Sequence, residues 1–176
     1  TNYSPRLAVF PDNSVVVTWS VEDSAVRFQR ISADGNLMWG DGILIEGVLG
    51  ASLMSPQPII NADGDALIQW IHQTGPFWAA DSEVYLQKYN LEGNPLWNEP
   101  TVVAGPVVFP MGNWSQQSIS DGISGSYSAW TRMSGNVQSA TTQHVMGDGA
   151  VSWAGGVNFS TNTSSFHISP RLAISE

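Results

Sequence analysis

The stretch QRISADGNLMW, from Gln29 to Trp39, occurs three times in this chain in related form. The second copy is QKYNLEGNPLW at residues 87–97, and the third is QHVMGDGAVSW at residues 143–153. In each copy the glutamine precedes the tryptophan by ten residues, and an acidic residue followed by glycine begins five residues after the glutamine. Successive copies are 58 and 56 residues apart. A fixed period of this kind is typical of stacked or radial repeat architectures.

Each unit also contains further β-like runs in a constant order. One run ends in a second tryptophan, as in VVVTW, ALIQW and SYSAW, and another run, SPRLAVF, SPQPII or SQQSIS, precedes it. The glutamine lies in a third run, and the tryptophan ten residues later opens a fourth. All four are rich in β-branched and aromatic residues and are separated by Gly, Asp and Asn, which is the composition of short strands joined by turns. Because no segment shows an apolar period of 3.6 residues, we expect no substantial helix.

Four antiparallel strands in a unit of this length predict an all-β fold, a β-propeller-type array of four-stranded blades. The expected units are residues 1–54 for blade 1, 55–114 for blade 2 and 115–168 for blade 3, with 169–176 as the first strand of a further blade.

The last of these units rests on a repeat, because SPRLAI near the end of the chain matches SPRLAV at residues 4–9. Three blades and one strand leave sheet faces and an edge unpaired. We therefore expect either a piece of a longer propeller or several chains that complete a ring, and an isolated chain that is oligomeric or prone to aggregation.

The repeated residues have structural interpretations. The tryptophans are expected to pack between neighbouring blades, with one set equivalent at Trp19, Trp70 and Trp130 and the other at Trp39, Trp97 and Trp153. The acidic-Gly pairs predict hairpin turns between third and fourth strands. The three glutamines are expected to satisfy backbone groups, since buried amides are nearly always hydrogen-bonded.

Composition excludes several partners and cofactors. The 176 residues carry a formal net charge of −9, with only six Lys and Arg, which disfavours nucleic acid. No apolar run approaches the roughly 18 residues needed for membrane insertion. There is no cysteine, so disulfides and thiolate metal sites are excluded. His72, His144 and His167 show no metal-ligand spacing. We expect no metal and no cofactor.

VRFQRISADGNLMWGDGILI and EVYLQKYNLEGNPLW resemble the propeller-like repeats of large secreted and cell-surface proteins of bacteria, especially of Bacteroidetes and marine groups. The third unit departs from that pattern, because TTQHVMGDGAVSW lacks its aromatic residue and its arginine. The resemblance implies an extracellular or cell-surface, non-catalytic module that serves as a scaffold or in binding and adhesion. Its implied partners are other blades of the same longer chain or a partner protein, with a glycan as a further candidate.

A candidate binding face comes from loop lengths. The spacing from the strand-ending tryptophan to the glutamine varies among 10, 17 and 13 residues, and variable loops on a rigid scaffold commonly carry binding. Two tryptophans outside the repeat pattern map to this same end of the blades. The expected ligand-binding residues are Phe77, Trp78, Phe109, Met111 and Trp114. Such aromatic faces suit sugar rings or a protein partner; alternatively, these loops cover the blade ends or pack on a neighbouring blade.

Two other functions stay open at this point. One is a carbohydrate-binding, lectin-like module that uses the face of Trp78 and Trp114. The other is part of a glycan-processing propeller enzyme, which would need two carboxylates in a cleft. Asp81 and Glu83 are the acidic pair beside the aromatic loop.

Overall fold

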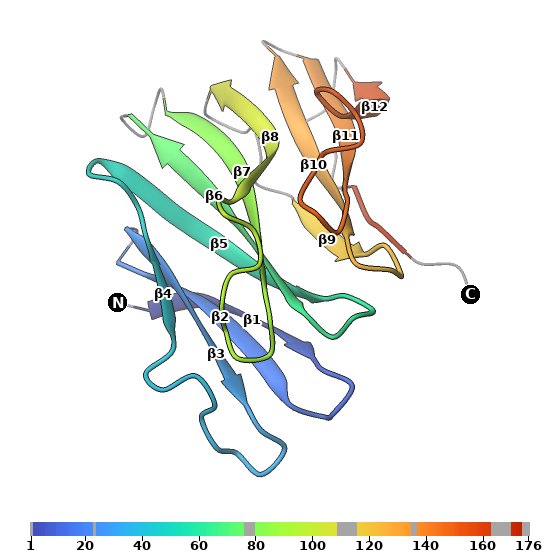
Figure 1. Cartoon of the computed structure of the whole chain (residues 1–176). Helices are drawn as coiled ribbons and strands as arrows, with labels where there is room; N and C mark the ends of the chain where they lie inside the picture. Colours follow the sequence, from blue (N-terminus) through green and yellow to red (C-terminus); the bar gives the residue numbers. More distant parts are fainter. Residues whose placement is uncertain are drawn as a thin grey trace.

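The computed structural model describes residues 2–22, 24–75, 80–108, 116–134, 137–162 and 170–173. Twelve β-strands and no helix occur in these residues, which confirms the all-β prediction (Figure 1). The described chain accordingly offers no helix long and apolar enough to cross a membrane. The strands are β1 Asn2–Val9, β2 Val15–Val21, β3 Ala25–Ile31, β4 Ile43–Glu46, β5 Ala51–Ile60, β6 Ala66–Thr74, β7 Asp81–Tyr89, β8 Thr101–Val108, β9 Gln117–Ser120, β10 Ser126–Ser134, β11 Val137–Val145 and β12 Val157–Asn162.

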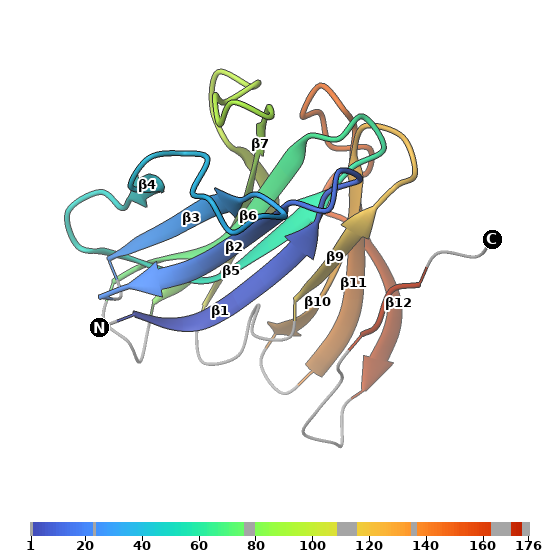
Figure 2. The same cartoon turned by 90° about the horizontal axis from the view of Figure 1, so that it is seen from below.

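The strands form three sheets of four, and each sheet holds one copy of the repeated Gln-to-Trp stretch. Sheet one contains β1 to β4, sheet two β5 to β8 and sheet three β9 to β12, always antiparallel and paired in chain order. The first strands β1, β5 and β9 gather near one another, and β5 contacts both of the others. The fourth strands lie at the outer margin, so the three sheets are arranged like a fan (Figures 1 and 2).

The pairing register is the same in all three sheets. The repeated glutamine lies opposite Val17 in sheet one, Ile68 in sheet two and Ser128 in sheet three. The tryptophan that ends each second run follows two residues later on the same strand face. Trp19, Trp70 and Trp130 are therefore structurally equivalent, as the repeat predicts.

The acidic-Gly pairs form the predicted hairpin turns. Gly35, Gly93 and Gly149 have φ values of 85°, 85° and 90°, a conformation that glycine adopts at little cost. In each turn the glycine N–H donates to the carbonyl three residues earlier. The third-to-fourth connections are thus built identically.

One strand prediction is wrong in detail. The tryptophan that follows each turn does not open the fourth strand. A single bridge pairs residue 31 with 37, 89 with 95 and 145 with 151, and a short loop containing the tryptophan follows. The fourth strands begin four residues after the tryptophan in sheets one, two and three, at Ile43, Thr101 and Val157. The departure has a physical reason, since the glutamine side chain donates to a backbone carbonyl of this loop, at Gly40, Trp97 or Trp153, where a strand partner would otherwise be.

Two apolar cores lie between successive sheets. The first fills the space between sheets one and two and includes Val16, Phe28, Trp39, Ile68 and Trp70. The second lies between sheets two and three and includes Leu67, Leu86, Val103, Trp130 and Val145. The predicted packing of tryptophans between neighbouring units is therefore confirmed at both interfaces.

Burial of the equivalent tryptophans depends on their position in the fan. Trp70 and Trp130 are each 3% exposed, because each faces the preceding sheet. Trp19 is only half-buried, since the described chain has no sheet before sheet one. In the other set Trp39 is buried, whereas Trp97 and Trp153 are half-buried.

Pro170–Ala173 belong to none of the three sheets. A further strand over residues 169–176 stays a prediction, because the other residues of that range are not described.

Candidate functional site

The five aromatic-face residues predicted from loop lengths, Phe77, Trp78, Phe109, Met111 and Trp114, lie outside the described residues. The strand ends that flank them are described. Thr74 pairs with Asp81, and Asp81 pairs with Val108, at the end of sheet two opposite the Glu92-Gly93 turn. The flanking strand ends therefore share one end of the sheet, and the binding face itself stays a prediction.

The acidic pair Asp81 and Glu83 lies on β7. Glu83 accepts a hydrogen bond of 3.0 Å from the hydroxyl of Tyr85, and one carboxylate oxygen is 3.6 Å from Nδ1 of His72. Burial, followed by the bond to Glu83 and its charge, raises the pKa of Tyr85. Glu83 is thus held by its neighbours on sheet two, while Asp81 is exposed at the strand end.

The repeated glutamines bind backbone within their own sheets, as predicted. Gln29 donates to the carbonyl of Gly40 at 2.8 Å and accepts from the N–H of Trp39 at 2.9 Å. Gln87 and Gln143 each donate to the carbonyl of the tryptophan ten residues later. Each amide therefore fixes the tryptophan loop that follows the turn.

That loop places an indole against the next sheet. The Nε1–H of Trp39 donates to the carbonyl of Leu91 in sheet two at 3.0 Å, and the Nε1–H of Trp97 donates to the carbonyl of Gly147 in sheet three at 3.1 Å. Leu91 and Gly147 occupy the same turn position, immediately before the acidic residue. We call this contact the inter-sheet indole bond. Trp153, the third equivalent, makes no such bond with any described residue.

A second repeated feature pairs a basic side chain with a carboxylate. The residue after each glutamine is Arg30, Lys88 or His144, and its partner lies in the turn between the first two strands of the same sheet. Arg30 is 2.6 Å from Asp12, Lys88 is 3.1 Å from Asp65, and His144 is 2.9 Å from Asp121. This cation position was not recognised in the sequence, although the basic residue always follows the glutamine.

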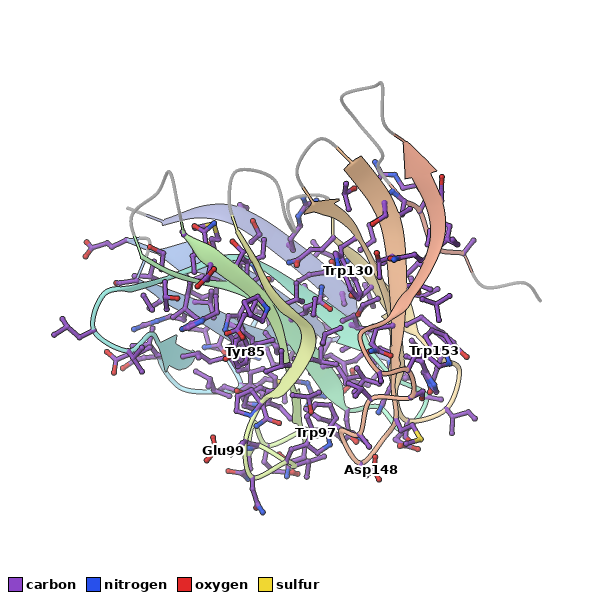
Figure 3. The ribbon with its side chains drawn as sticks, turned by 90° about the horizontal axis from the view of Figure 1, so that it is seen from above. Tyr85, Trp97, Glu99, Trp130, Asp148 and Trp153 are labelled. Carbon is purple, nitrogen blue, oxygen red and sulfur yellow. The ribbon has the colours of Figure 1, made fainter. Side chains whose placement is uncertain are left out.

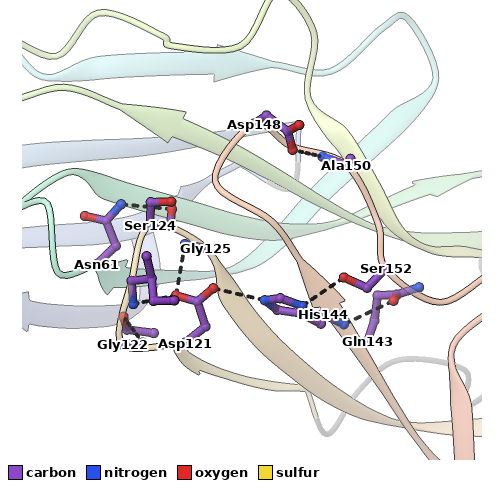
Figure 4. Close-up of polar contacts among 12 residues, drawn as sticks. Asn61, Asp121, Gly122, Ser124, Gly125, Gln143, His144, Asp148, Ala150 and Ser152 are labelled. Atoms are coloured by element: carbon purple, nitrogen blue, oxygen red, sulfur yellow. Dashed lines mark hydrogen bonds and ion pairs between the residues drawn. The ribbon is translucent and has the colours of Figure 1, made fainter.

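In sheet three this position forms a Ser-His-Asp chain (Figure 4). Nε2 of His144 lies 2.9 Å from Oδ2 of Asp121, and Nδ1 lies 2.8 Å from Oγ of Ser152. When Nε2 donates to Asp121, Nδ1 accepts from the hydroxyl of Ser152. Burial raises the pKa of Asp121, but the bonds from His144, Ile123 and Gly125 and the charge of His144 outweigh burial and leave that pKa below its ordinary value.

The residues around Ser152, His144 and Asp121 do not complete an acyl-transfer site. The N–H of Ser152 donates to the carbonyl of His144, and the N–H of Trp153 donates to Oε1 of Gln143. Those two groups are therefore already engaged and cannot serve as oxyanion donors, which such chemistry requires. The ring is also reversed relative to a serine protease, where Nε2 faces the nucleophile. Equivalence with the Arg30–Asp12 and Lys88–Asp65 pairs indicates a structural role for the contact between His144 and Asp121.

A cavity of about 360 Å³ lies between sheets two and three. One wall is β8, and the other contains Trp130 and Gln143. Figure 3 shows Trp97 beside the turn that carries Asp148, with Trp130 farther along the sheets. The lining residues are Val102, Val103, Ala104, Gly105, Pro106, Trp130, Gln143, Val151 and Gly155.

Comparison with known proteins finds no match, either to a family model or to a curated protein. In the described ranges no group of three or more His, Asp or Glu residues could hold a metal ion.

Proposed function

We propose that this chain is a non-catalytic β-propeller-type repeat module of an exported or cell-surface bacterial protein, and that it acts as a scaffold for protein or ligand binding. The observation that carries the proposal is the recurrence of one contact between successive sheets. The inter-sheet indole bond joins sheet one to sheet two, and an equivalent bond joins sheet two to sheet three. Such a head-to-tail contact extends to further units without change, as in other repeat proteins.

Both ends of the fan support extension by further units. On the outer face of sheet one, Leu7 and Val9 are 64% and 57% exposed and lie opposite Val17 and Val15. In sheet two the equivalents of Val17 and Trp19 are Ile68 and Trp70, which are packed against sheet one. An exposed apolar face of this kind marks an interaction site.

Sheet three carries the matching surface. Tyr127 stacks on His144 with ring centroids 4.5 Å apart, and Trp153 lies 6.2 Å from each of these rings. The equivalents of these three residues in sheet one, Val16, Arg30 and Trp39, face sheet two. We therefore assign the outer faces of sheets one and three to another unit of the same repeat.

A non-catalytic role is supported by the repeat equivalence of His144, since the same position carries Arg30 and Lys88 in ion pairs of the same kind. A carbohydrate-binding role of Trp78 and Trp114 and a glycan-processing role of Asp81 and Glu83 stay predictions from the sequence.

Sedimentation of the isolated chain tests the proposal. We expect concentration-dependent association, which Trp19→Arg on sheet one or Trp153→Arg on sheet three each abolishes. Because the contact is head-to-tail, a mixture of the two variants should form a 1:1 dimer through the one intact pair of faces. Leu49→Arg, at a fully exposed loop position, is the matched control and should associate like the parent chain. A parent chain that stays monomeric, or a mixture that does not dimerise, would contradict the proposal.

A further inference from the structure

One edge of β8 is free. β8 is the last strand of sheet two and pairs with β7, and no described strand pairs with its other edge. With eight residues it is also the longest of the fourth strands, since β4 has four and β12 has six. Its sequence, TVVAGPVV, carries no charge. Natural edge strands are commonly short or protected by charged side chains, and a long uncharged edge is a template for another strand.

The cavity between sheets two and three runs along this free edge. Five consecutive residues of β8, 102–106, line it. Because successive side chains of a strand point to opposite faces, a space that touches five residues in a row lies along the backbone edge. The cavity is open to solvent, since Val102, Val151 and both lining glycines are exposed. An occupant would therefore meet the outward N–H and C=O groups of β8.

The wall opposite β8 is mostly apolar. The Gln143 amide is engaged within sheet three, and none of the described lining residues is charged. Val103 and Ala104 of β8 also belong to the apolar core between the two sheets, so the cavity continues that interface outward. An occupant should place apolar side chains against this wall. Its residues are Trp130, Gln143, Val151 and Gly155.

Two glycines leave room in the cavity. A Cβ on Gly105 or on Gly155 would meet nothing within 4 Å, so the space beside both is open. At the start of β8, the hydroxyl of Thr101 donates to the carbonyl of Gly149 at 2.7 Å. Sheets two and three are thus joined at Thr101, and the cavity extends along the following residues of β8.

We propose that β8 binds an uncharged, extended peptide segment of a partner protein, which pairs with the free edge as a fifth strand of sheet two and places alternate apolar side chains against Trp130 and Val151. In this mode of recognition main-chain hydrogen bonds give affinity, and pockets for alternate side chains give specificity. Pro106 has no N–H, which confines pairing to the residues before it and suits a segment of about four to six residues. The site lies apart from the outer faces of sheets one and three, so it goes beyond the proposed association of units and does not rest on it.

A generic strand-forming peptide tests the site in the full chain. The probe has about six residues in which valine and threonine alternate, with a fluorophore at its N-terminus and an amide at its C-terminus. We expect saturable binding in fluorescence anisotropy. Amide hydrogen exchange at alternate residues of 101–105 should slow about tenfold in the complex, because those N–H groups become hydrogen-bonded.

Two N-methylated peptides separate backbone pairing from apolar contact. Successive residues of an extended peptide direct their N–H groups to opposite edges, so methylation of the valines blocks one edge and methylation of the threonines blocks the other. One of these peptides should lose about tenfold in affinity, and the other should bind like the unmodified probe. Equal affinities of the two would show that β8 does not pair with the peptide, and would overturn the proposal.

Variants of the protein test the location. Val151→Asp places a charge on the apolar wall, and Gly105→Leu fills the cavity from β8; each should weaken binding about tenfold in a chain whose thermal melt shows that it is folded. Leu37→Asp is the matched control, because Leu37 has the same bridge position in sheet one and does not line this cavity. It should bind the probe like the parent chain.

The remaining outcomes each overturn the proposal. One is the absence of saturable binding, and another is binding that Val151→Asp and Gly105→Leu leave unchanged. If the β8 amides are already protected without peptide, a segment of the same chain covers the edge, or a second copy covers it where the protection rises with protein concentration. Displacement of the probe by methyl glucoside would show a sugar site instead.

Discussion

The indole N–H of Trp39 donates to the carbonyl of Leu91, a residue 52 positions later in the chain and in a different sheet. Replacing Trp39 with Phe keeps an aromatic ring but removes this bond. We expect the free energy of unfolding to fall by about 1 kcal/mol, the usual net value of one hydrogen bond. Trp153→Phe is the control when both variants are made in the monomeric Trp19→Arg chain, because the described residues give Trp153 no equivalent acceptor, and it should change stability by less than about 0.5 kcal/mol. Equal losses in urea denaturation of the two variants would contradict the assignment.

The turn glycines separate backbone strain from interface packing. Gly35 and Gly93 share a φ of 85°, so an alanine at either position adopts an unfavourable conformation. A Cβ at Gly35 meets nothing within 4 Å, whereas a Cβ at Gly93 would lie 2.5 Å from Ile43 and 3.2 Å from Trp39. We expect Gly93→Ala to cost about 1–3 kcal/mol more than Gly35→Ala, the typical penalty for overpacking. Thermal unfolding of the pair measures the difference, and similar melting temperatures would show that sheet one does not press on this turn.

Glutamine replacement should destabilise the tryptophan loop. In Gln29→Leu the N–H of Trp39 and the carbonyl of Gly40 lose their partners. The first of these hydrogen bonds is buried and the second is partly buried. The expected cost is about 1–3 kcal/mol in chemical denaturation. In Gln29→Glu the carboxylate can still accept from Trp39 but, when ionised, repels the carbonyl of Gly40. Stability of this second variant should therefore rise as pH falls and the new carboxyl is protonated; no such rise would argue against this pair of bonds.

Asp121 makes stability depend on acid pH. Its pKa in the folded protein is below the ordinary value of 3.8, so its interactions stabilise the fold above that value and are lost as pH falls through the lower folded pKa. Asp121→Asn should remove this contribution, and the stability difference between parent and variant should shrink as pH decreases below about 4. Asp34→Asn, at an exposed turn, is the control. If the stability difference between the parent and Asp121→Asn stays constant with pH, the charge of Asp121 does not contribute to stability.

The strands and turns were predictable because they depend on local composition and on the repeat. The Gln29 spacing located the hairpin turns, and the period gave three equivalent sheets. Aligning the units finds only some of the carboxylate partners, because the others shift within the first turn. Asp12 is the third residue of the turn 10–14 and Asp63, 3.7 Å from Lys88, is the third of 61–65. Asp65, which lies closer to Lys88, is the fifth of 61–65, and Asp121 is the first of 121–125. Carboxylates from three different turn positions thus contact the side chain that follows the repeated glutamine, and only the folded structure shows that they do.

The cavity was also invisible in the sequence. Its lining residues come from β8 of sheet two and from Trp130, Gln143, Val151 and Gly155 of sheet three. The cavity therefore exists only where two sheets pack together, and no pattern within one unit of the sequence indicates it.

The inter-sheet indole bond joins a tryptophan of one unit to a backbone carbonyl of the next, and a carbonyl is present whatever the side chain. Leu91 and Gly147 differ in sequence and accept the same bond. Substitution at the acceptor position therefore leaves the bond intact, and recombination that adds or deletes one whole unit recreates it at the new junction. An array built in this way can change length in steps of one unit without compensating mutations, and the contact depends on the side chain of the tryptophan and not on that of its acceptor.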